Sequence, residues 1–414
     1  MTKVNEFLDE KIVIKELSNG AKCYIIEKKG FTYATAYVTF GIGSADTSFL
    51  VNGVKTEYPC GIAHFLEHKL FEDESINVFE RFAENGADVN AFTNFTNTTY
   101  YYNCSGNFYK NLKQLLSVVQ TPYFTADNVE KEKGIITQEI NMYKDDPFWR
   151  GYLDILEIMY KNNPIRYDIA GTVQSISKIT EAMLYECYRQ FYSPRNMALI
   201  CVGDIDPEKI FEIAENDLKP RLNRIQKVYK EEPREVLKRE NTAKMGLPRP
   251  LYNIGFKDGD LSGGAARRIC ANKMLIDLLA GESSPLYERL YEAGLIDQTY
   301  SIEYTGALFF GYFLISGFSC APREVRDAVL NEYKNLQKSG FSQTDFQRIK
   351  TKHLGKLRRS FNDLDNIAQI QSDFFTKNSD IFEIADAYEK ITLDDIHENL
   401  KNLSDETNSL SIVT

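Results

Sequence analysis

The sequence predicts an α+β protein of two homologous domains of similar size, each a mostly antiparallel sheet with helices packed on it. Segments rich in β-branched and aromatic residues, a pattern typical of strands, alternate with longer segments whose apolar residues recur at helical spacing. A chain of 414 residues is too long for one hydrophobic core, so two domains of about 200 residues are expected. The two halves repeat a similar order of strands and helices, which indicates an internal duplication.

In the first half, the spacing of apolar residues and the positions of turn residues indicate where the strands and helices lie. Residues 197–203 form a continuous apolar run, which is typical of a buried strand, and residues 88–94 and 98–104 indicate a hairpin. The other strands are expected at residues 12–17, 22–28 and 33–41. Helices are expected at residues 60–72, 76–85, 107–120, 126–145, 148–161, 179–190 and 206–217.

The composition then changes. Residues 219–242 contain two prolines and many charges but few large apolar side chains, which is typical of an exposed linker. We therefore predict an N-terminal domain at residues 1–222, a charged linker at 223–245 and a C-terminal domain at 246–414. In the second domain, strands are expected at 251–256, 299–306, 309–318 and 409–413, and helices near 264–280, 284–293 and onward to residue 401.

The motif with the most specific chemistry is His64-Phe65-Leu66-Glu67-His68, within the predicted helix 60–72. Its order, H-x-x-E-H, is the inverse of the common zinc-protease order H-E-x-x-H. Residues three and four apart share a helix face, so His64 and His68 can bind one Zn²⁺ while Glu67 faces the open coordination position. The alternative for each residue alone is a helix side chain without a metal, but that alternative must explain all three at ligand spacing.

A zinc site of this kind needs a third protein ligand, and residues 129–140 offer the best candidates. Glu132 and Glu139 are seven apart in a predicted helix, so they project from the same side almost two turns apart. One can bind the metal, and the other can accept the second N–H of a ligand imidazole. The spacing alone does not decide between them, and a solvated helix face is the alternative for either residue alone.

These motifs resemble those of the pitrilysin/insulinase family of zinc peptidases, the inverzincins, which share H-x-x-E-H followed by a distant E-x(6)-E helix. The resemblance is greatest to the half-size bacterial branch, which is related to mitochondrial processing peptidase. It is strong over residues 60–205 and weak in the last part of the chain. Further matching segments are Ile169-Ala170-Gly171-Thr172, Ser175-Ile176, Tyr192-Ser193-Pro194-Arg195-Asn196-Met197 and Val202-Gly203-Asp204.

The resemblance implies that Glu139 is the third zinc ligand. It also implies that Glu132 supports catalysis from behind the metal ligands, without binding the metal itself. It also implies a substrate-binding strand, with the Asn90 amide and the Ala91 backbone near the scissile bond. The residues of this strand are Asn90, Ala91, Phe92 and Thr93. An exposed strand can hold an extended peptide by backbone hydrogen bonds. For Asn90, a turn residue without a role in binding is the alternative.

The expected activity is that of a zinc-dependent endopeptidase with one Zn²⁺ per chain. A zinc ion held by His64, His68 and Glu139 leaves a position for water and lowers the pKa of this water to about 7. Glu67 would take the proton of the water and pass it to the leaving amine, as general base and then general acid.

The second half departs from the family pattern at one segment. Family members carry an Arg followed by a Tyr that are thought to reach the substrate, but Tyr291 stands at the position of the Arg. Arg289 is two positions away, and Tyr300 is the nearest candidate for the Tyr. We therefore predict a heterodimer, in preference to a homodimer, in which a homologous half-size subunit without the zinc motif supplies the Arg/Tyr pair. The two subunits would enclose a chamber that admits peptides and unfolded segments.

A non-catalytic scaffold subunit that retains the peptidase fold is the alternative function. A site that had decayed in this way would be expected to lose at least one residue, yet the motif, Glu132 and Glu139 are all present. A structural zinc site is a third interpretation. Such sites usually contain several cysteines, and none lies at ligand spacing from the motif.

Net charge, hydropathy and cysteine content limit the expected partners of the protein and the cell compartment in which it is expected. The net charge of −10 argues against nucleic acid, and the basic run at 350–359 is interpreted as a solvated helix face. The longest apolar run, residues 308–320, is too short to cross a bilayer, and the N-terminus lacks an apolar signal region, so no membrane partner is expected. Seven widely spaced cysteines without a CxxC pair indicate reduced thiols and a cytoplasmic protein.

Overall fold

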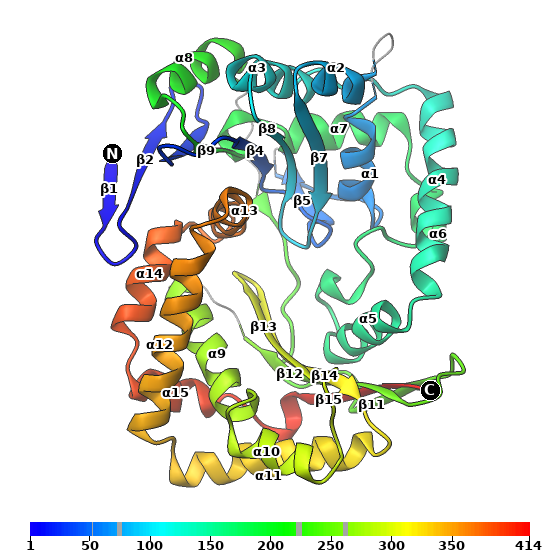
Figure 1. Cartoon of the computed structure of the whole chain (residues 1–414). Coiled ribbons are helices and arrows are strands. Elements are labelled where there is room, and N and C mark those ends of the chain that lie inside the picture. The colour runs from blue at the N-terminus through cyan, green and yellow to red at the C-terminus, as the bar shows by residue number, and fades with distance from the viewer. Residues whose placement is uncertain (52, 73–76, 221–225, 260–263) are drawn as a thin grey trace. The chain divides into compact units, whose positions relative to one another are not determined.

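The computed structural model describes residues 1–51, 53–72, 77–220, 226–259 and 264–414, which form two compact units. Unit 1 consists of Met1–Ile140, Asp168–Val228 and Arg358–Phe382, and unit 2 of Asn141–Tyr167, Tyr229–Leu357 and Glu383–Thr414. Each unit has one main sheet with helices packed against it, which is the α+β organisation that the sequence predicts (Figure 1).

Unit 1 is built on a seven-stranded sheet within the described residues. In the order in which they lie side by side, its strands are β1 (Thr2–Asn5), β2 (Glu10–Glu16), β3 (Lys22–Glu27), β9 (Met197–Gly203), β4 (Ala34–Phe40), β8 (Thr98–Cys104) and β7 (Ala87–Thr93). The β3–β9 pair is parallel and the other pairs are antiparallel. A smaller sheet joins β5 (Ser48–Val51), β6 (Val54–Glu57) and β10 (Gln226–Lys227).

Helices cover this sheet and bury its central strands. The helices within unit 1 are α1 (Ile62–Lys69), α2 (Val78–Glu84), α3 (Phe108–Val118), α6 (Val173–Ile176), α7 (Glu181–Phe191), α8 (Pro207–Asp217) and α13 (Leu364–Phe375), and α4 (Ala126–Lys144) begins in unit 1. Every residue of β4 and β9 is buried, as expected for strands covered on both faces.

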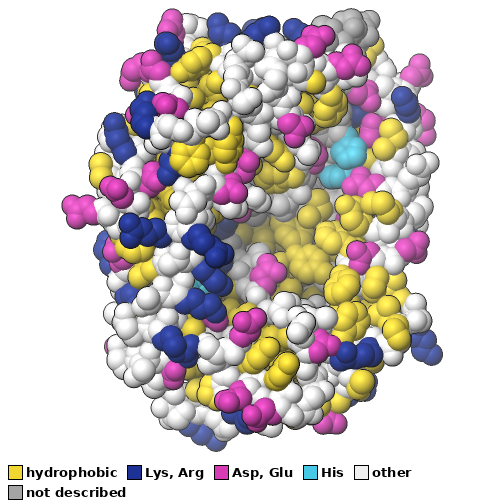
Figure 2. Space-filling view, viewed as in Figure 1, with side chains coloured by type: hydrophobic (Ala, Val, Ile, Leu, Met, Phe, Trp, Pro, Cys, Tyr) yellow, Lys and Arg dark blue, Asp and Glu magenta, His cyan; other side chains and the backbone are white. Residues whose placement is uncertain are grey.

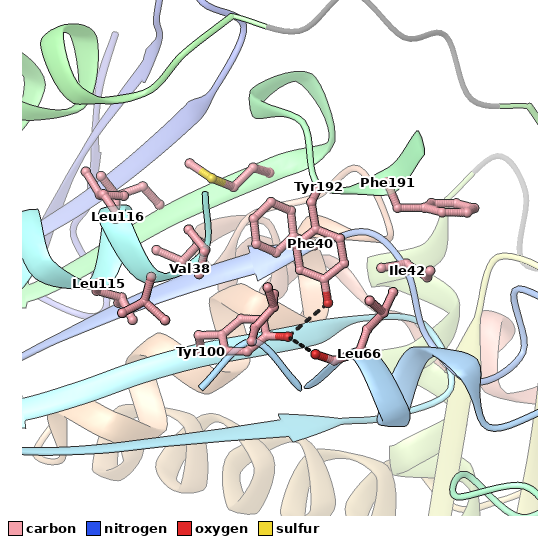
Figure 3. Packing of buried hydrophobic residues seen from close by; sticks show 14 of the residues in the cluster. Val38, Phe40, Ile42, Leu66, Tyr100, Leu115, Leu116, Phe191 and Tyr192 are labelled. Atoms are coloured by element: carbon pink, nitrogen blue, oxygen red, sulfur yellow. Dashed lines mark hydrogen bonds between the residues drawn. The ribbon is translucent and has the colours of Figure 1, made fainter. Parts of the chain in front are cut away.

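Aromatic side chains fill the core beside α1. Figure 3 shows Phe40, Tyr100 and Tyr192 packed together, with the Phe40 and Tyr192 ring centroids 4.3 Å apart. The hydroxyls of Tyr100 and Tyr192 are 2.9 Å apart, and the Tyr100 hydroxyl donates to the Leu66 carbonyl at 3.5 Å. This layer fixes α1, which carries the H-x-x-E-H motif, against the sheet.

Unit 2 is built on a five-stranded sheet within the described residues. Its strands, in order, are β11 (Glu240–Ala243), β15 (Asn408–Val413), β12 (Leu251–Asp258), β14 (Phe310–Phe318) and β13 (Ser301–Ala307). Its helices are α5 (Pro147–Met159), α9 (Ala265–Ala280), α10 (Pro285–Glu292), α11 (Pro322–Ser339) and α15 (Leu393–Leu400), with most of α12 (Gln343–Ser360) and α14 (Ile381–Lys390).

The two main sheets share one topology. The order β3-β9-β4-β8-β7 in unit 1 corresponds to β11-β15-β12-β14-β13 in unit 2, with one parallel pair followed by antiparallel pairs in both. The helices α1, α2, α3, α4 and α5 interrupt the first series as α9, α10, α11, α12 and α13 interrupt the second. The correspondence confirms the predicted fold of two homologous α+β domains.

One helical segment from each half of the chain belongs to the unit of the other half. Helix α5 packs on β12 and β15, where Gly255 permits a close approach: an added Cβ would lie 2.5 Å from Met159 Sδ. Helix α13 packs on β4 and β9. The compact units therefore differ from the predicted segments 1–222 and 246–414 at residues 141–167 and 358–382. The apolar face of an amphipathic helix shows that the helix packs on another element, but it does not show which one.

Residues of the predicted linker, 223–245, also take part in the sheets. Strand β10 pairs with β5, and β11 pairs in parallel with β15. The predicted boundary between residues 222 and 223 lies outside the described residues, as does the first residue of the predicted helix 76–85. Strands β1 and β6 are not among the predicted elements, because they bury too few side chains to show an apolar alternation.

The structure also bears on two expectations drawn from composition. Across the residues that it describes, no helix combines the length and the hydropathy that a membrane span requires. All seven cysteines have free thiols, and Cys320 is exposed while the other six are at least partly buried.

Replacing Gly255 by valine should destabilise unit 2, because the added side chain would overlap Met159 and Ile155 of α5. Overpacking of this kind costs about 1–3 kcal/mol, which a lower midpoint of denaturant unfolding, followed by circular dichroism, would report. The matched control is Gly355→Val in α12, where nothing lies within 4 Å of an added Cβ and little change is expected. Equal stability of the two variants would contradict a tight contact between α5 and β12.

Candidate metal centre

Helix α1 presents the motif from a fixed position in unit 1. Its N-cap is Gly61, which has a left-handed φ of 92°. A Cβ at this position would lie 2.4 Å from the Ala170 carbonyl oxygen, so both the conformation and the close approach require glycine. Phe65 and Leu66 are fully buried and anchor the helix in the core. The motif side chains therefore extend from a rigid backbone.

Helix α4 brings two carboxylates to the same place. Glu132 lies in the buried apolar face of α4, together with valine and isoleucine side chains. Glu132 Oε1 is 2.8 Å from His68 Nδ1. The two carboxylate oxygens of Glu139 lie 3.6 Å from His64 Nε2 and 3.6 Å from His68 Nε2. The seven-residue spacing thus delivers one carboxylate to each nitrogen of the His68 ring.

His64, His68 and Glu139 each place a ligand atom within 4.8 Å of the other two. The 3.6 Å distances from the two Glu139 oxygens to His64 Nε2 and His68 Nε2 are longer than hydrogen bonds. They are close to the edge, about 3.4 Å, of a tetrahedron whose zinc–ligand bonds are about 2.1 Å. Two imidazole nitrogens and one carboxylate oxygen are a donor set that zinc prefers, with a fourth position left for water. The residues present therefore fit a zinc ion. Figure 2 shows histidine side chains, in cyan, at the surface over α1, so solvent reaches this site.

The two imidazoles differ in their affinity for protons. Burial and the neighbouring His68 lower the pKa of His64 to about 3, so His64 is neutral at pH 7. Burial also opposes a charge on His68, but the hydrogen bond with Glu132 and the nearby carboxylates raise its pKa overall. Glu132 is buried as well, yet the same contact lowers its pKa. A metal ion at His68 therefore competes with a proton.

Glu67 is held beside the metal ligands by a residue of β7. The Thr93 hydroxyl donates to Glu67 Oε2 at 2.7 Å. Burial raises the pKa of Glu67, and this hydrogen bond and the nearby His68 oppose the rise. A carboxylate with a raised pKa is suited to accept a proton and later return it. Thr93, predicted only as part of a substrate strand, thus also orients Glu67.

The predicted substrate strand is the edge of its sheet. Among the described residues, β7 pairs with β8 alone, so one side of its backbone can accept another strand. The strand contacts α1 and contains Asn90, Ala91, Phe92 and Thr93. Asn90 is exposed, and its side-chain oxygen accepts the Ala91 N–H at 2.8 Å. The structure therefore brings all the residues predicted for the site into one region of unit 1.

Two charged residues beside the site, Lys69 and Glu72, are not among the residues predicted from the sequence. The Lys69 side chain is fully buried, forms an ion pair with Glu72 and donates to the Asn128 carbonyl at 3.4 Å. Both residues are neighbours of Glu132. The only sequence signal for Lys69 is a lysine that directly follows the motif on the apolar face of its helix.

The segment that departs from the family pattern lies in unit 2. Tyr291, on α10, is 51% exposed and stacks on Tyr287. The Tyr300 hydroxyl donates to the Ala280 carbonyl at 2.7 Å, and Arg289 forms an ion pair with Glu332. The Tyr300 hydroxyl and the Arg289 guanidinium thus already have partners within unit 2.

Comparison with known proteins identifies the family. The family model described as Insulinase (Peptidase family M16) matches residues 34–173, and the one described as Peptidase M16 inactive domain matches residues 178–352. The protein named Uncharacterized zinc protease YmfH, from Bacillus subtilis (strain 168), is 39% identical over 402 residues, which cover 94% of this chain and 93% of that protein. The chain therefore belongs to the M16 (insulinase) family of peptidases, as its motifs predict.

Solved structures share the fold. An M16-like peptidase from Alicyclobacillus acidocaldarius has a TM-score of 0.94 at 31% identity, and the match covers 98% of both chains. Pitrilysin has a TM-score of 0.77 at 15% identity, and the match covers 100% of this chain but 46% of pitrilysin. At that identity the similarity shows the fold alone.

We expect the purified chain to bind one zinc ion and Glu139→Ala to abolish tight binding, because one of three ligands is removed. Glu132→Gln should retain the ion but weaken its affinity about 10- to 100-fold, since Glu132 orients the His68 ring. Atomic emission gives the stoichiometry, and competition with a chromophoric chelator gives the affinity. Glu130→Gln, an exposed change on the same helix, should bind like the wild type. Unchanged zinc affinity in Glu139→Ala would contradict the assigned ligand set.

Proposed function

We propose that this chain is a zinc-dependent endopeptidase that cleaves peptides or unfolded segments. The observation that carries the proposal is the convergence of His64, His68 and Glu139 on one point, with Glu67 on the same helix and bonded to an edge strand. The name of the Bacillus subtilis relative, a zinc protease, agrees with this proposal.

The proposed mechanism assigns a task to each side chain. When bound, zinc supplies Lewis-acid activation of water. Glu67, held by Thr93, takes a proton from water and returns it to the leaving amine. Glu132 accepts the Nδ1–H of His68, which keeps Nε2 free to face the metal position.

We propose that the peptide binds as an additional strand on β7. The Ala91 N–H, now bonded to the Asn90 side chain, would be offered to a substrate carbonyl, and the Asn90 amide would turn to the peptide. Backbone hydrogen bonds of this kind tolerate many side chains but require an extended chain. This binding mode favours peptides and unfolded segments over folded proteins.

The active form that we propose is a heterodimer with an enclosed chamber. The partner is a homologous half-size subunit that lacks the zinc motif and supplies an Arg/Tyr pair. Support comes from Tyr291 at the position of the Arg, and from the engagement of Arg289 and Tyr300 within unit 2. A homodimer would carry two zinc sites and no such pair.

Glu67→Gln should abolish cleavage but retain zinc, because the amide cannot accept the proton while the three ligands remain. Loss of a general base lowers kcat about 10²- to 10⁴-fold, which hydrolysis of a quenched fluorescent peptide, with the partner subunit present, would measure. Glu84→Gln, an exposed change on α2, is the matched control and should remain active. Zinc-loaded wild-type protein that cleaves nothing, with or without the partner, would favour the non-catalytic scaffold.

The heterodimer requires that the purified chain alone be a poor enzyme. With zinc bound, we expect little hydrolysis of the fluorescent peptide by the lone chain and a large increase when a homologous half-size chain with the Arg/Tyr pair is added. Size-exclusion chromatography of the same samples should show the mixed dimer. Full activity of a lone monomer or homodimer would disprove the need for a partner while leaving the zinc-peptidase proposal intact.

A further inference from the structure

We propose that Lys69 is a positioning residue that keeps Glu132 on the His68 ring and thereby sets the metal affinity of the site. The inference rests on the zinc-peptidase function proposed above, and it concerns a residue outside the H-x-x-E-H motif and outside the E-x(6)-E helix.

The first observation is the burial of a charge. The Lys69 side chain has 0% of its surface exposed, and its neighbours on the buried face of α1, Phe65, Leu66 and Leu70, are also buried. Lysine is almost never fully buried unless its ammonium group is paired, because removing the charge from water is costly. A leucine or methionine would fill this apolar position at no such cost, so the ammonium group itself requires an explanation.

The second observation is where the ammonium group is directed. It forms an ion pair with Glu72, and it donates to the carbonyl of Asn128 at 3.4 Å. Asn128 lies in the first turn of α4, one turn before Glu132, so the two residues are neighbours on that helix. Lys69 therefore connects the end of α1 with α4 one turn before Glu132, the residue that is hydrogen-bonded to His68.

The third observation is the arrangement of charge around Glu132. The Glu132 side chain is 6% exposed, and both the positive charge of Lys69 and a hydrogen bond with the Glu72 side chain lower its pKa. A carboxylate in a poorly solvated site is costly unless hydrogen bonds and a nearby cation offset its charge. Lys69 is that cation. Without Lys69, the Glu132 carboxylate loses the positive charge that stabilises it, and its hydrogen bond with the His68 ring weakens.

The inference differs from a purely structural role in a measurable way. A lysine that only ties α1 to α4 would affect folding stability when removed, but it would not act on zinc through Glu132. A positioning lysine would change the zinc dissociation constant of the folded protein, and its effect would vanish once Glu132 can no longer serve the His68 ring.

The test uses the full chain with Lys69→Met, Glu132→Gln and both changes together. Zinc dissociation constants come from chelator competition, and thermal unfolding of the zinc-free proteins reports stability. We expect Lys69→Met to weaken zinc binding about 10- to 100-fold, and the double variant to bind no more weakly than Glu132→Gln alone. Lys131→Met is the matched control, since it removes an exposed charge beside Glu132 in sequence and should leave zinc affinity unchanged.

If Lys69→Met does not fold, Glu72→Gln provides a second test. Glu72→Gln breaks the ion pair at a side chain that is 35% exposed, while the positive charge of Lys69 stays near Glu132. We expect zinc affinity equal to or higher than that of the wild type, whereas a tie through Glu72 would predict lower affinity. Wild-type affinity in folded Lys69→Met, additive losses in the double variant, or weaker binding by Glu72→Gln would each overturn the inference. A wild-type chain that binds no zinc would overturn the proposed function instead.

Discussion

The hydrogen bond between His68 and Glu132 joins the two helices on which the site depends. These residues are 64 positions apart in the sequence, yet their side-chain atoms lie 2.8 Å apart. Because α1 supplies both histidines and α4 supplies both carboxylates, no metal position exists until the helices meet in this register. The contact also directs Nε2 of His68 towards Glu139, and Thr93 of β7 holds Glu67 by a hydrogen bond.

The duplication shows what the second copy of this helix pair contains. In the order of elements, α9 and α12 of unit 2 take the places of α1 and α4. Their contact carries the Asp277 carboxylate, with Lys352 Nζ at 2.8 Å and His353 Nε2 at 3.1 Å. A lysine ammonium group thus neutralises the buried carboxylate there, and the helices are joined without any need for a metal. This agrees with the description of the family model over residues 178–352 as an inactive domain.

Local pattern was sufficient for the elements with strong periodicity and for the motif. The strand at 197–203 has the predicted bounds, and α4 ends one residue before its predicted end. Helical spacing also placed the histidines on one helix face and the glutamates on another. Only the fold shows that Glu139 lies near both imidazole rings and that Glu132 is hydrogen-bonded to Nδ1 of His68. The sheets on which α5 and α13 pack were not predictable, because a binary pattern shows that a face is buried but not against what. Lys69 escaped prediction because a lysine is assigned to solvent until its partners are known.

Because α5 packs in unit 2 and α13 packs in unit 1, the core of unit 1 is not complete when the N-terminal half of the chain has been translated. Strands β4 and β9 are complete once residue 203 has been translated, but the helix that covers them does not leave the ribosome until residue 375 has followed. Between these two points of translation, the nascent N-terminal half therefore carries an uncovered apolar sheet face, the kind of surface that chaperones bind. Neither half of the gene, expressed separately, would encode a chain that can close its own core.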